Sequence, residues 1–349
     1  MTDQLVIRAI VKDDYTALAE FNSSFPDDRL SKEDWLKRFN YWWDENPAYI
    51  TDWPSGFVII AEDRIQGFVG SFPTFFNAEG TKIRAFNGTT WRVHKSYRKW
   101  SIDLWAQNRT ASSGMLCFNT TATEDVIRLI LKFGYKRYPW GAEKVSYQLI
   151  RPFDALKCFL PSQYCCLSYP AGILIQARDA VSTLLFNHSF QVRFSGIKES
   201  EIDDLWERTK SIYPYTNHRS SSVVKWYSAK RLLVGIYHDE TLAAYAIFSE
   251  FRHESYKFNE LVLVDFWYDP LFGLKGLLQA LIHGVKTYAL QHNIVMVKYH
   301  HFSSMMTSIL MKLPLLSRNY IPGGYIKTDN LNLTQTNSYF TLLQGDFDA

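Results

Sequence analysis

One order of expected strands and helices occurs twice along the 349 residues of the chain. Each half opens with a short apolar strand, at 6–8 and at 192–193, followed by a charged break and a helix with acidic residues at its start. Apolar runs on either side of polar turns then predict one hairpin at 57–69 and another at 232–247. A chain that repeats this order is expected to form two copies of one α/β unit with a mixed sheet.

Further along each half, a strand leads directly into a helix, and a second strand and helix follow. These pairs and the strand-like segments that close each half fall at 91–104, 115–132, 135–138 and 145–150 in the first half, and at 261–285, 294–312, 320–327 and 339–343 in the second. The repeated order strengthens each assignment, because the hydrophobic periodicity of a single short segment is a weak signal.

Length and composition predict a folded protein with two domains. The chain is 47% hydrophobic and 21% charged, which is typical of folded proteins. We expect a first domain at 1–155, a packed connector at 156–189 and a second domain at 190–349. The connector is apolar, so we expect it to pack between the halves. The net charge of +3 is small for this length, and no nucleic-acid partner is expected.

The sequence also bears on location and metal binding. The segment 1–4 lacks the basic start and apolar run of a secretory signal, and the apolar stretch 171–177 is too short to span a bilayer. The four cysteines, Cys117, Cys158, Cys165 and Cys166, lack the C-x-x-C spacing of a zinc site. We therefore expect a cytoplasmic protein with reduced thiols, no transmembrane segment and no bound metal.

A basic segment joins the strand at Trp91 to the helix that follows it. Such a loop is expected to leave backbone N–H groups unpaired at the helix N-terminus, where the helix dipole also favours an anion. Arg98 and Lys99 add two positive charges at the same place. The sequence therefore predicts a phosphate or pyrophosphate site here.

This segment resembles a known pyrophosphate-binding motif, V-x-P-x-Y-[R/Q]-x-x-G-x-[G/A]. The matching positions are Val93, Tyr97 and Arg98, and the departures are Lys95, Ser101 and Asp103. The motif is the acetyl-CoA loop of the GCN5-related N-acetyltransferases, which the chain resembles. Two further family motifs, an Asn-x-x-Ala after the fifth strand and a Gly-Phe pair after the next helix, are similar to 119–122 and 133–135.

The second half keeps other fragments of the same loop. Pro270 and Gly276 are in place, but Gly273 stands where the family has Arg or Gln. The resemblance thus extends over both halves as a tandem arrangement. Further segments resemble the tandem acyltransferases associated with bacterial surface polysaccharides: 34–39 with Asn46-Pro47, Arg219 followed by 225–227, and 345–348.

The resemblance implies an acyltransferase that passes an acyl group, acetyl first of all, from acyl-CoA to an amine or hydroxyl. The implied cofactor is acetyl-CoA or another acyl-CoA. The implied partner is a small-molecule or sugar-linked acceptor, such as an amino sugar of a surface-polysaccharide precursor. The residues that the resemblance assigns to the acyl-CoA site are Val93, Arg98, Lys99, Trp100, Ser101, Ile102 and Asn119. For Asn119, a simple strand-end turn is an equally good interpretation.

The general base is left open by the sequence. Acyl transfer to an amine requires a base whose pKa lies near the working pH. The Tyr that serves as the acid in many family members is replaced here by Ile130. Asp265, a carboxylate inside an apolar strand, and His301, just after a strand, are the candidate catalytic residues. The alternative for Asp265 is an ion pair with Arg219 or Lys225. The alternative for His301 is a surface or capping role.

Two other functions are compatible with the same fold. A Fem-type aminoacyl transferase shares the tandem arrangement but uses aminoacyl-tRNA, which the low net charge disfavours. A non-catalytic binding or scaffold protein would account for the missing tyrosine and glycines. The aromatic residues at 35–43 share one helical face, which favours core packing over stacking against an acceptor.

Overall fold

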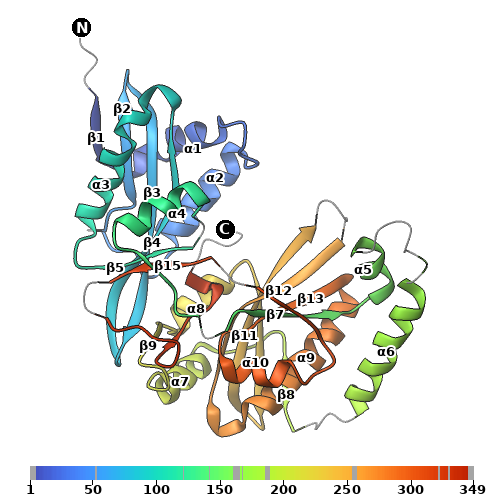
Figure 1. The fold of residues 1–349 in the computed structure, drawn as a ribbon. Helices are drawn as coiled ribbons and strands as arrows, with labels where there is room; N and C mark the ends of the chain where they lie inside the picture. Colours follow the sequence, from blue (N-terminus) through green and yellow to red (C-terminus); the bar gives the residue numbers. More distant parts are fainter. Residues whose placement is uncertain are drawn as a thin grey trace.

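The strands form two mixed sheets, and helices cover their faces (Figure 1). The structure is a computed structural model that describes residues 5–51, 53–120, 122–140, 142–159, 166, 168–184, 189–253, 258–320, 323–328 and 331–344. The expected mixed α/β class is confirmed. The terminal segment 345–348, part of the polysaccharide-type resemblance, lies outside the described residues.

The first sheet has the order β1-β2-β3-β4-β5-β15-β6, and β9 and β16 extend it beside β3. β1 to β4 are antiparallel, whereas β4 and β5 are parallel. The strands are β1 (Val6–Ala9), β2 (Gly56–Ala61), β3 (Arg64–Ala78), β4 (Thr81–Val93), β5 (Leu116–Asn119), β6 (Lys136–Arg137), β9 (Tyr215–Asn217), β15 (Tyr325–Lys327) and β16 (Ser338–Tyr339).

The second sheet repeats the central part of this arrangement. Its order is β14-β7-β13-β12-β11-β10-β8, with an antiparallel hairpin of β10 and β11 and a parallel pair of β12 and β13. Its strands are β7 (Lys144–Leu149), β8 (Gln191–Arg193), β10 (Leu232–His238), β11 (Thr241–His253), β12 (Phe258–Tyr268), β13 (Ile294–His300) and β14 (Leu316–Asn319).

Helices lie on both faces of the first sheet because adjacent strand residues point to opposite sides. On β5, Phe118 packs in the core with the helices of the N-terminal segment, whereas Cys117 packs with the two later helices. The helices of the two halves are α1 (Tyr15–Ser23), α2 (Lys32–Phe39), α3 (Ser101–Ala111), α4 (Glu124–Lys132), α7 (Glu199–Thr209), α8 (Ser221–Ser228), α9 (Leu274–Gln291) and α10 (Ser304–Leu310).

Each sheet contains a strand from the other half of the sequence. β7 pairs with β13 and β14 in the second sheet, and β15 pairs with β5 and β6 in the first. The two segments expected to close the first half, 135–138 and 145–150, therefore lie in different sheets. The division of the chain at 155 and 190 stays a prediction, and the exchange ties the two parts together.

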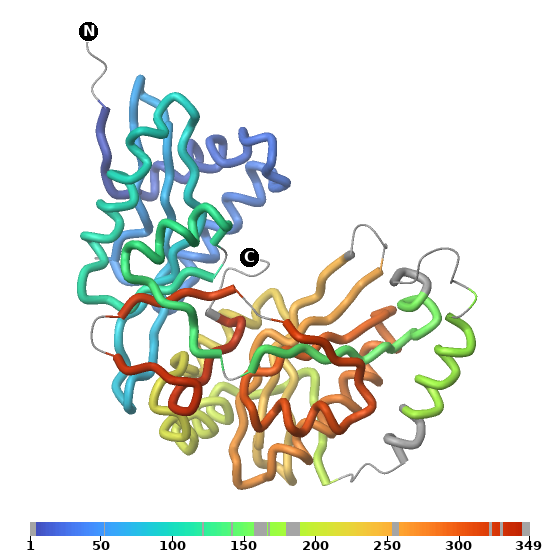
Figure 2. The backbone as a smooth tube through the Cα atoms, in the orientation of Figure 1, coloured from blue at the N-terminus to red at the C-terminus, as the bar shows by residue number. Residues whose placement is uncertain are grey.

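The expected connector at 156–189 contains the second half of α5 (Pro152–Phe159) and all of α6 (Ser168–Leu184). Ala155 and Leu156 pack in a cluster with Phe258 and Met296 of the second sheet. Figures 1 and 2, which share one orientation, show α6 on the side of that sheet away from the first one. The described part of the connector therefore does not pack between the halves as expected. Leu156 and Ile175 pack against the second sheet, whereas Tyr169, Ile173 and Leu174 are exposed.

Aromatic side chains fill the contact between the halves. The aromatic residues at 35–43 are all buried, which confirms the core interpretation. Tyr41 stacks on Trp226 of α8 with ring centroids 4.6 Å apart. The Trp226 indole Nε1–H donates to the Tyr41 carbonyl oxygen at 2.9 Å. These contacts belong to one continuous core that spans both sheets.

Candidate functional site

A cavity of about 340 Å³ opens where β4 and β5 diverge. β4 pairs with β5 only over 85–87 and then continues to Val93 without this partner. The cavity wall combines the ends of both strands with α3, the start of α4 and the segment after α1. The lining residues are Asp27, Val69, Phe86, Gly88, Thr89, Thr90, Trp91, Arg92, Trp105, Asn108, Arg109, Asn119, Ala122, Thr123, Val126 and Tyr135.

A bulge in β4 coincides with this divergence. In the pairing with β3, Val69 faces Trp91 and Gly70 faces Thr89, so Thr90 is an extra residue. Thr90 has a φ of 31°, in the left-handed region. A bulge bends the strand and leaves part of its backbone outside the ladder. The cavity thus lies beside a stretch of β4 where part of the backbone is outside the hydrogen-bond ladder of the sheet.

Three polar side-chain atoms around the cavity are buried without a hydrogen-bond partner among the described residues. They are Trp91 Nε1, Asn108 Oδ1 and Asn119 Oδ1. An unpaired buried polar group costs about 1–3 kcal/mol. One donor and two acceptors around one cavity therefore suit a ligand that carries amide or hydroxyl groups. Asn119 is here the one residue of the predicted acyl-CoA set that lines the cavity.

One face of α3 lines the cavity along its length. Trp105, Asn108 and Arg109 face it, and Ser101 lies one turn before Trp105 on the same stripe. Ile102 and Asp103 are exposed on other faces of the helix. Asp103, a departure from the family motif, therefore stays off the face that lines the cavity.

The basic segment before α3 is a 3₁₀ helix, η3 (Lys95–Trp100), and not an open loop. The Tyr97 N–H donates to the His94 carbonyl at 2.8 Å, and the Ser101 N–H donates to the Arg98 carbonyl. A 3₁₀ helix uses the N–H groups that an open loop would leave unpaired. The expectation of a free backbone cradle is therefore wrong for these two groups. The exposed side chains of Lys95, Arg98 and Lys99 place positive charge at this end.

The remaining predicted residues of this segment are partly structural. Val93 packs with Leu104 and Ile59 in a small core cluster, and Trp100 packs against the same cluster. The Lys99 ammonium lies over the Trp100 ring, 5.4 Å from its centroid. η3 is thus anchored by its apolar residues, while its charges face outward.

Sequence reasoning missed Asp27 and the inner wall of α3. Arg92 forms an ion pair with Asp28 and donates to the Asn22 carbonyl at 3.1 Å. These contacts hold the segment that brings exposed Asp27 to the cavity. No local signal marks Asp27, because a tertiary contact places it. Asn108 follows Ser101 by seven residues, so helical spacing alone would have found it.

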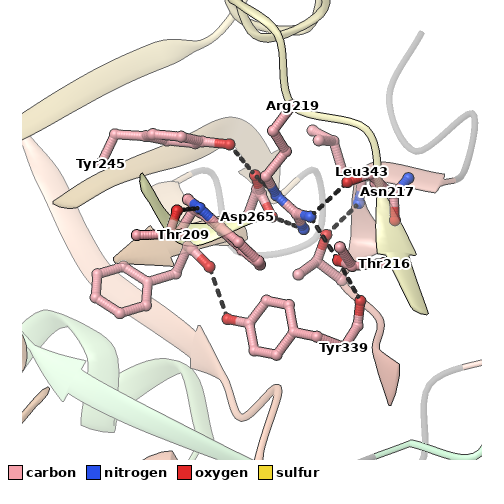
Figure 3. A network of polar contacts seen from close by, with 11 residues as sticks. Thr209, Thr216, Asn217, Arg219, Tyr245, Asp265, Tyr339 and Leu343 are labelled. Atoms are coloured by element: carbon pink, nitrogen blue, oxygen red, sulfur yellow. Dashed lines mark hydrogen bonds and ion pairs between the residues drawn. The ribbon is translucent and has the colours of Figure 1, made fainter. Parts of the chain in front are cut away.

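The second half has the same divergence, and a buried network of polar side chains that includes Asp265 lies there (Figure 3). β12 pairs with β13 as far as Leu263 and not beyond it. In the pairing of β12 with β11, Val264 is an extra residue, as Thr90 is in β4. Asp265 follows at once and pairs with Arg219, Oδ1 to Nη2, at 3.1 Å, with both side chains fully buried. The Tyr339 hydroxyl donates to the Phe266 carbonyl oxygen at 2.6 Å.

Further hydrogen bonds surround the ion pair between Arg219 and Asp265. Tyr245 donates its hydroxyl to Asp265 at 3.0 Å, and burial raises the pKa of that phenol, so it stays protonated. Arg219 also donates to Thr216 Oγ1 and to the Asn217 carbonyl, at 2.6 and 2.9 Å. The alternative interpretation of Asp265, an ion pair with Arg219, is therefore what the structure contains. Lys225 pairs with Glu199 instead.

His301 lies beside the exchanged strand β7 and does not line the cavity between β4 and β5. Its Nε2 is 2.8 Å from Ser146 Oγ, and its Nδ1 is 3.2 Å from Thr307 Oγ1. The Thr307 hydroxyl donates to the Ser303 carbonyl, so it accepts from Nδ1–H, and Nε2 accepts from Ser146. Burial lowers the pKa of His301 to about 4.

A second opening, of about 600 Å³, lies at the start of α9. His238, Gly273 and Lys275 contribute to its wall, where the sequence keeps fragments of the acyl-CoA loop. Gly273 precedes α9 with a φ of 74°. The lining of this opening does not include Arg219, Asp265 or Tyr339.

Comparison with solved structures gives the fold class. A GCN5-related N-acetyltransferase from Kribbella flavida aligns with a TM-score of 0.58 and 11% identity, over 93% of this chain and 71% of that one. N-myristoyltransferase of Saccharomyces cerevisiae, solved with bound myristoyl-CoA, gives 0.52 and 13%, over 93% and 79%. A probable N-acyltransferase from Enterococcus faecalis V583 gives 0.57 and 10%, over 96% and 74%. The chain thus has the fold of the GCN5-related N-acetyltransferases.

Other comparisons add limits. No protein-family model matches the sequence, and no curated protein matches it either. Within the described residues, no helix combines the length and apolar character needed to cross a bilayer. The same residues contain no cluster of three His, Cys, Asp or Glu side chains arranged for a metal ion.

Proposed function

We propose that the chain is an acyltransferase that takes an acyl group from acyl-CoA and transfers it to an amine or hydroxyl. The observation that carries the proposal is the cavity between β4 and β5, with its three unpartnered polar atoms. Structural neighbours that share the fold include enzymes named for acetyl and myristoyl transfer. Acetyl-CoA is the first ligand to test, and a cytoplasmic location is part of the proposal.

The proposal gives the first half the acyl-CoA site. Arg98 and Lys99 would neutralise the phosphates, since charge-assisted hydrogen bonds to phosphate are strong. The arm of the ligand would follow the stripe of α3 that begins at Ser101. Asn108 and Asn119 would accept hydrogen bonds from its amide groups. Acyl-CoA supplies the activated thioester when it is bound.

The chain's own groups then support attack by the acceptor. The unpaired backbone near the Thr90 bulge would donate to the thioester oxygen as negative charge develops there. Asp27 is the carboxylate among the described lining residues, and we propose that it accepts the proton of the attacking amine or hydroxyl. The catalytic roles predicted for Asp265 and His301 stay predictions, and no described contact links either residue to the cavity.

The acceptor class follows from resemblance alone. We propose a sugar-linked amine, such as an amino sugar of a surface-polysaccharide precursor. Its test is the release of free CoA thiol when acetyl-CoA is mixed with the protein and a panel of amino sugars. Replacement of Asp27 by Asn is expected to lower this release by about tenfold or more, because a positioned base contributes at least that much.

Calorimetric titration with acetyl-CoA tests the cofactor site directly. We expect micromolar binding by the natural sequence and about tenfold weaker binding by Arg98→Ala, through loss of a charge-assisted contact. Arg178→Ala on α6, also an exposed arginine, is the matched control and is expected to bind normally.

The outcomes of this titration are distinct. Absence of binding at high micromolar acetyl-CoA would leave the non-catalytic alternative and overturn the proposal. Binding that survives in Arg98→Ala would move the phosphates away from η3, with the start of α9 as the next place to test.

A further inference from the structure

Arg109 places a guanidinium in the wall of the cavity without an acidic partner. It lines the cavity from α3, and no carboxylate forms an ion pair with it in the described part of the chain. Its Nη1 contacts the Cys117 sulfur and lies 3.5 Å from the Tyr135 hydroxyl. Neither partner is a carboxylate, so no described ion pair balances the positive charge of Arg109.

The surroundings of this guanidinium are apolar and aromatic. Its central carbon lies 5.9 Å from the ring centroid of Phe86 and 5.7 Å from that of Tyr135. Cys117 donates its S–H to the Met115 carbonyl at 3.2 Å, so its sulfur can accept from Arg109. These contacts fix the guanidinium in position while its Nε and Nη2 donors have no hydrogen-bond partner among the described residues.

The position along α3 separates Arg109 from the predicted phosphate end. Arg109 is eight residues after Ser101, which corresponds to about 12 Å along the helix axis. The proposed function assigns the phosphates to Arg98 and Lys99, which precede the start of α3. A second cation so far along the helix has no use for the same phosphates, and it lies toward the end where the acyl group would be held.

We infer that Arg109 selects an acyl group that itself ends in a carboxylate, as a succinyl group does. This inference rests on the proposed function, because it places the acyl end of acyl-CoA at the inner wall. A carboxylate would take two parallel N–H donors from the guanidinium, the geometry in which arginine binds carboxylates best. A neutral acyl chain would instead leave the charge without a partner in a partly buried site, which is costly.

Binding measurements with succinyl-CoA and butyryl-CoA test this inference. The two acyl groups have the same number of carbons, and only succinyl ends in a carboxylate. We expect the natural sequence to bind succinyl-CoA about tenfold or more tightly than butyryl-CoA. Arg109→Gln is expected to bind the two equally, and Arg109→Lys to keep part of the preference. Arg128→Gln on the exposed side of α4 is the matched control, and thermal melting confirms that each variant is folded.

Each result is decisive. Equal binding of the two acyl-CoAs by the natural sequence overturns the inference and leaves the proposed acyltransferase intact. If Arg109→Gln binds CoA, butyryl-CoA and succinyl-CoA more weakly by the same factor, Arg109 contacts the phosphates. That result would also overturn the inference. Failure of every CoA ligand to bind would overturn the proposed function itself.

Discussion

Arg219 and Asp265 form an ion pair, 3.1 Å between Nη2 and Oδ1, at a position in the second half that corresponds to the open cavity of the first half. Both side chains are completely buried, and the guanidinium lies 4.3 Å from the ring centroid of Trp267. The first half has Trp91 directly after its bulge, facing a cavity. The two halves therefore share a backbone plan but differ in what fills the divergence between the strands.

Breaking this ion pair is expected to destabilise the protein strongly. Asp265→Asn removes the negative charge and leaves Arg219 buried without a counterion, which costs about 3–5 kcal/mol of unfolding free energy. Urea unfolding followed by fluorescence measures this loss. Asp239→Asn at an exposed carboxylate is the control. The double variant Arg219→Met with Asp265→Leu should lose less than Asp265→Asn alone, and a single variant within about 1 kcal/mol of the natural sequence would contradict the argument.

Buried histidines are expected to make stability depend on pH. Burial lowers the pKa of His301 and His218 to about 4 and that of His300 to about 3, from an ordinary value of 6.5. The unfolded chain therefore binds more protons than the folded protein between these values. Stability is fully present above pH 6.5 and falls as the pH drops toward 4, by up to about 1.4 kcal/mol per pH unit for each histidine.

The measurement is urea unfolding between pH 4.5 and 7.5, about the range in which these groups differ between states. His301→Gln removes one of the three groups and should reduce the slope of stability against pH. An unchanged slope in this variant would show that His301 is not held neutral by its burial beside Ser146.

Gly88 is expected to control access to the cavity. A Cβ at this position would meet the Phe118 carbonyl oxygen at 3.6 Å and Asn119 Nδ2 at 3.8 Å, which are ordinary contacts. Gly88→Ala should therefore fold and bind acetyl-CoA normally. Gly88→Leu places a larger side chain in the cavity, and we expect normal thermal melting with about tenfold or greater loss of acetyl-CoA affinity. If Gly88→Leu binds as tightly as Gly88→Ala, the ligand does not occupy this cavity.

Local periodicity was enough to predict most elements but not their pairing. The strand and helix expected at 115–132 are β5 and α4 (Glu124–Lys132), and the hairpin expected at 232–247 is formed by β10 and β11. Both depend on neighbouring residues alone. The exchange of β7 and β15 depends on contacts between residues far apart in sequence, for which the pattern of one chain holds no signal.

In the candidate site, too, the residues placed by local sequence could be predicted and those placed by tertiary contacts could not. Asn119 was predicted from a motif at a strand end, and it lines the cavity. Asp27 reaches the same cavity only because Arg92 binds Asp28, a contact across the fold. The 3₁₀ geometry of η3 was also missed, since basic residues in a short segment do not distinguish an open loop from a tight helix.

The strand exchange predicts that the two parts of the chain stabilise each other. Without β15, the edges of β5 and β6 lose a paired strand, and without β7 the strand β13 loses one as well. Unpaired strand edges aggregate. Residues 1–155 and 190–349 expressed separately are therefore expected to be insoluble, whereas co-expression should yield a complex that purifies together.

A cut chain gives the control for this prediction. A protease site introduced between Leu184 and Ser189 should leave the two pieces associated in gel filtration after cleavage. Ile326→Asp on β15 puts a charge at a buried position of the first sheet, and it should weaken the association of the cut pieces. Separation of the unmodified pieces at micromolar concentration would mean that the exchanged strands contribute little to holding the halves together.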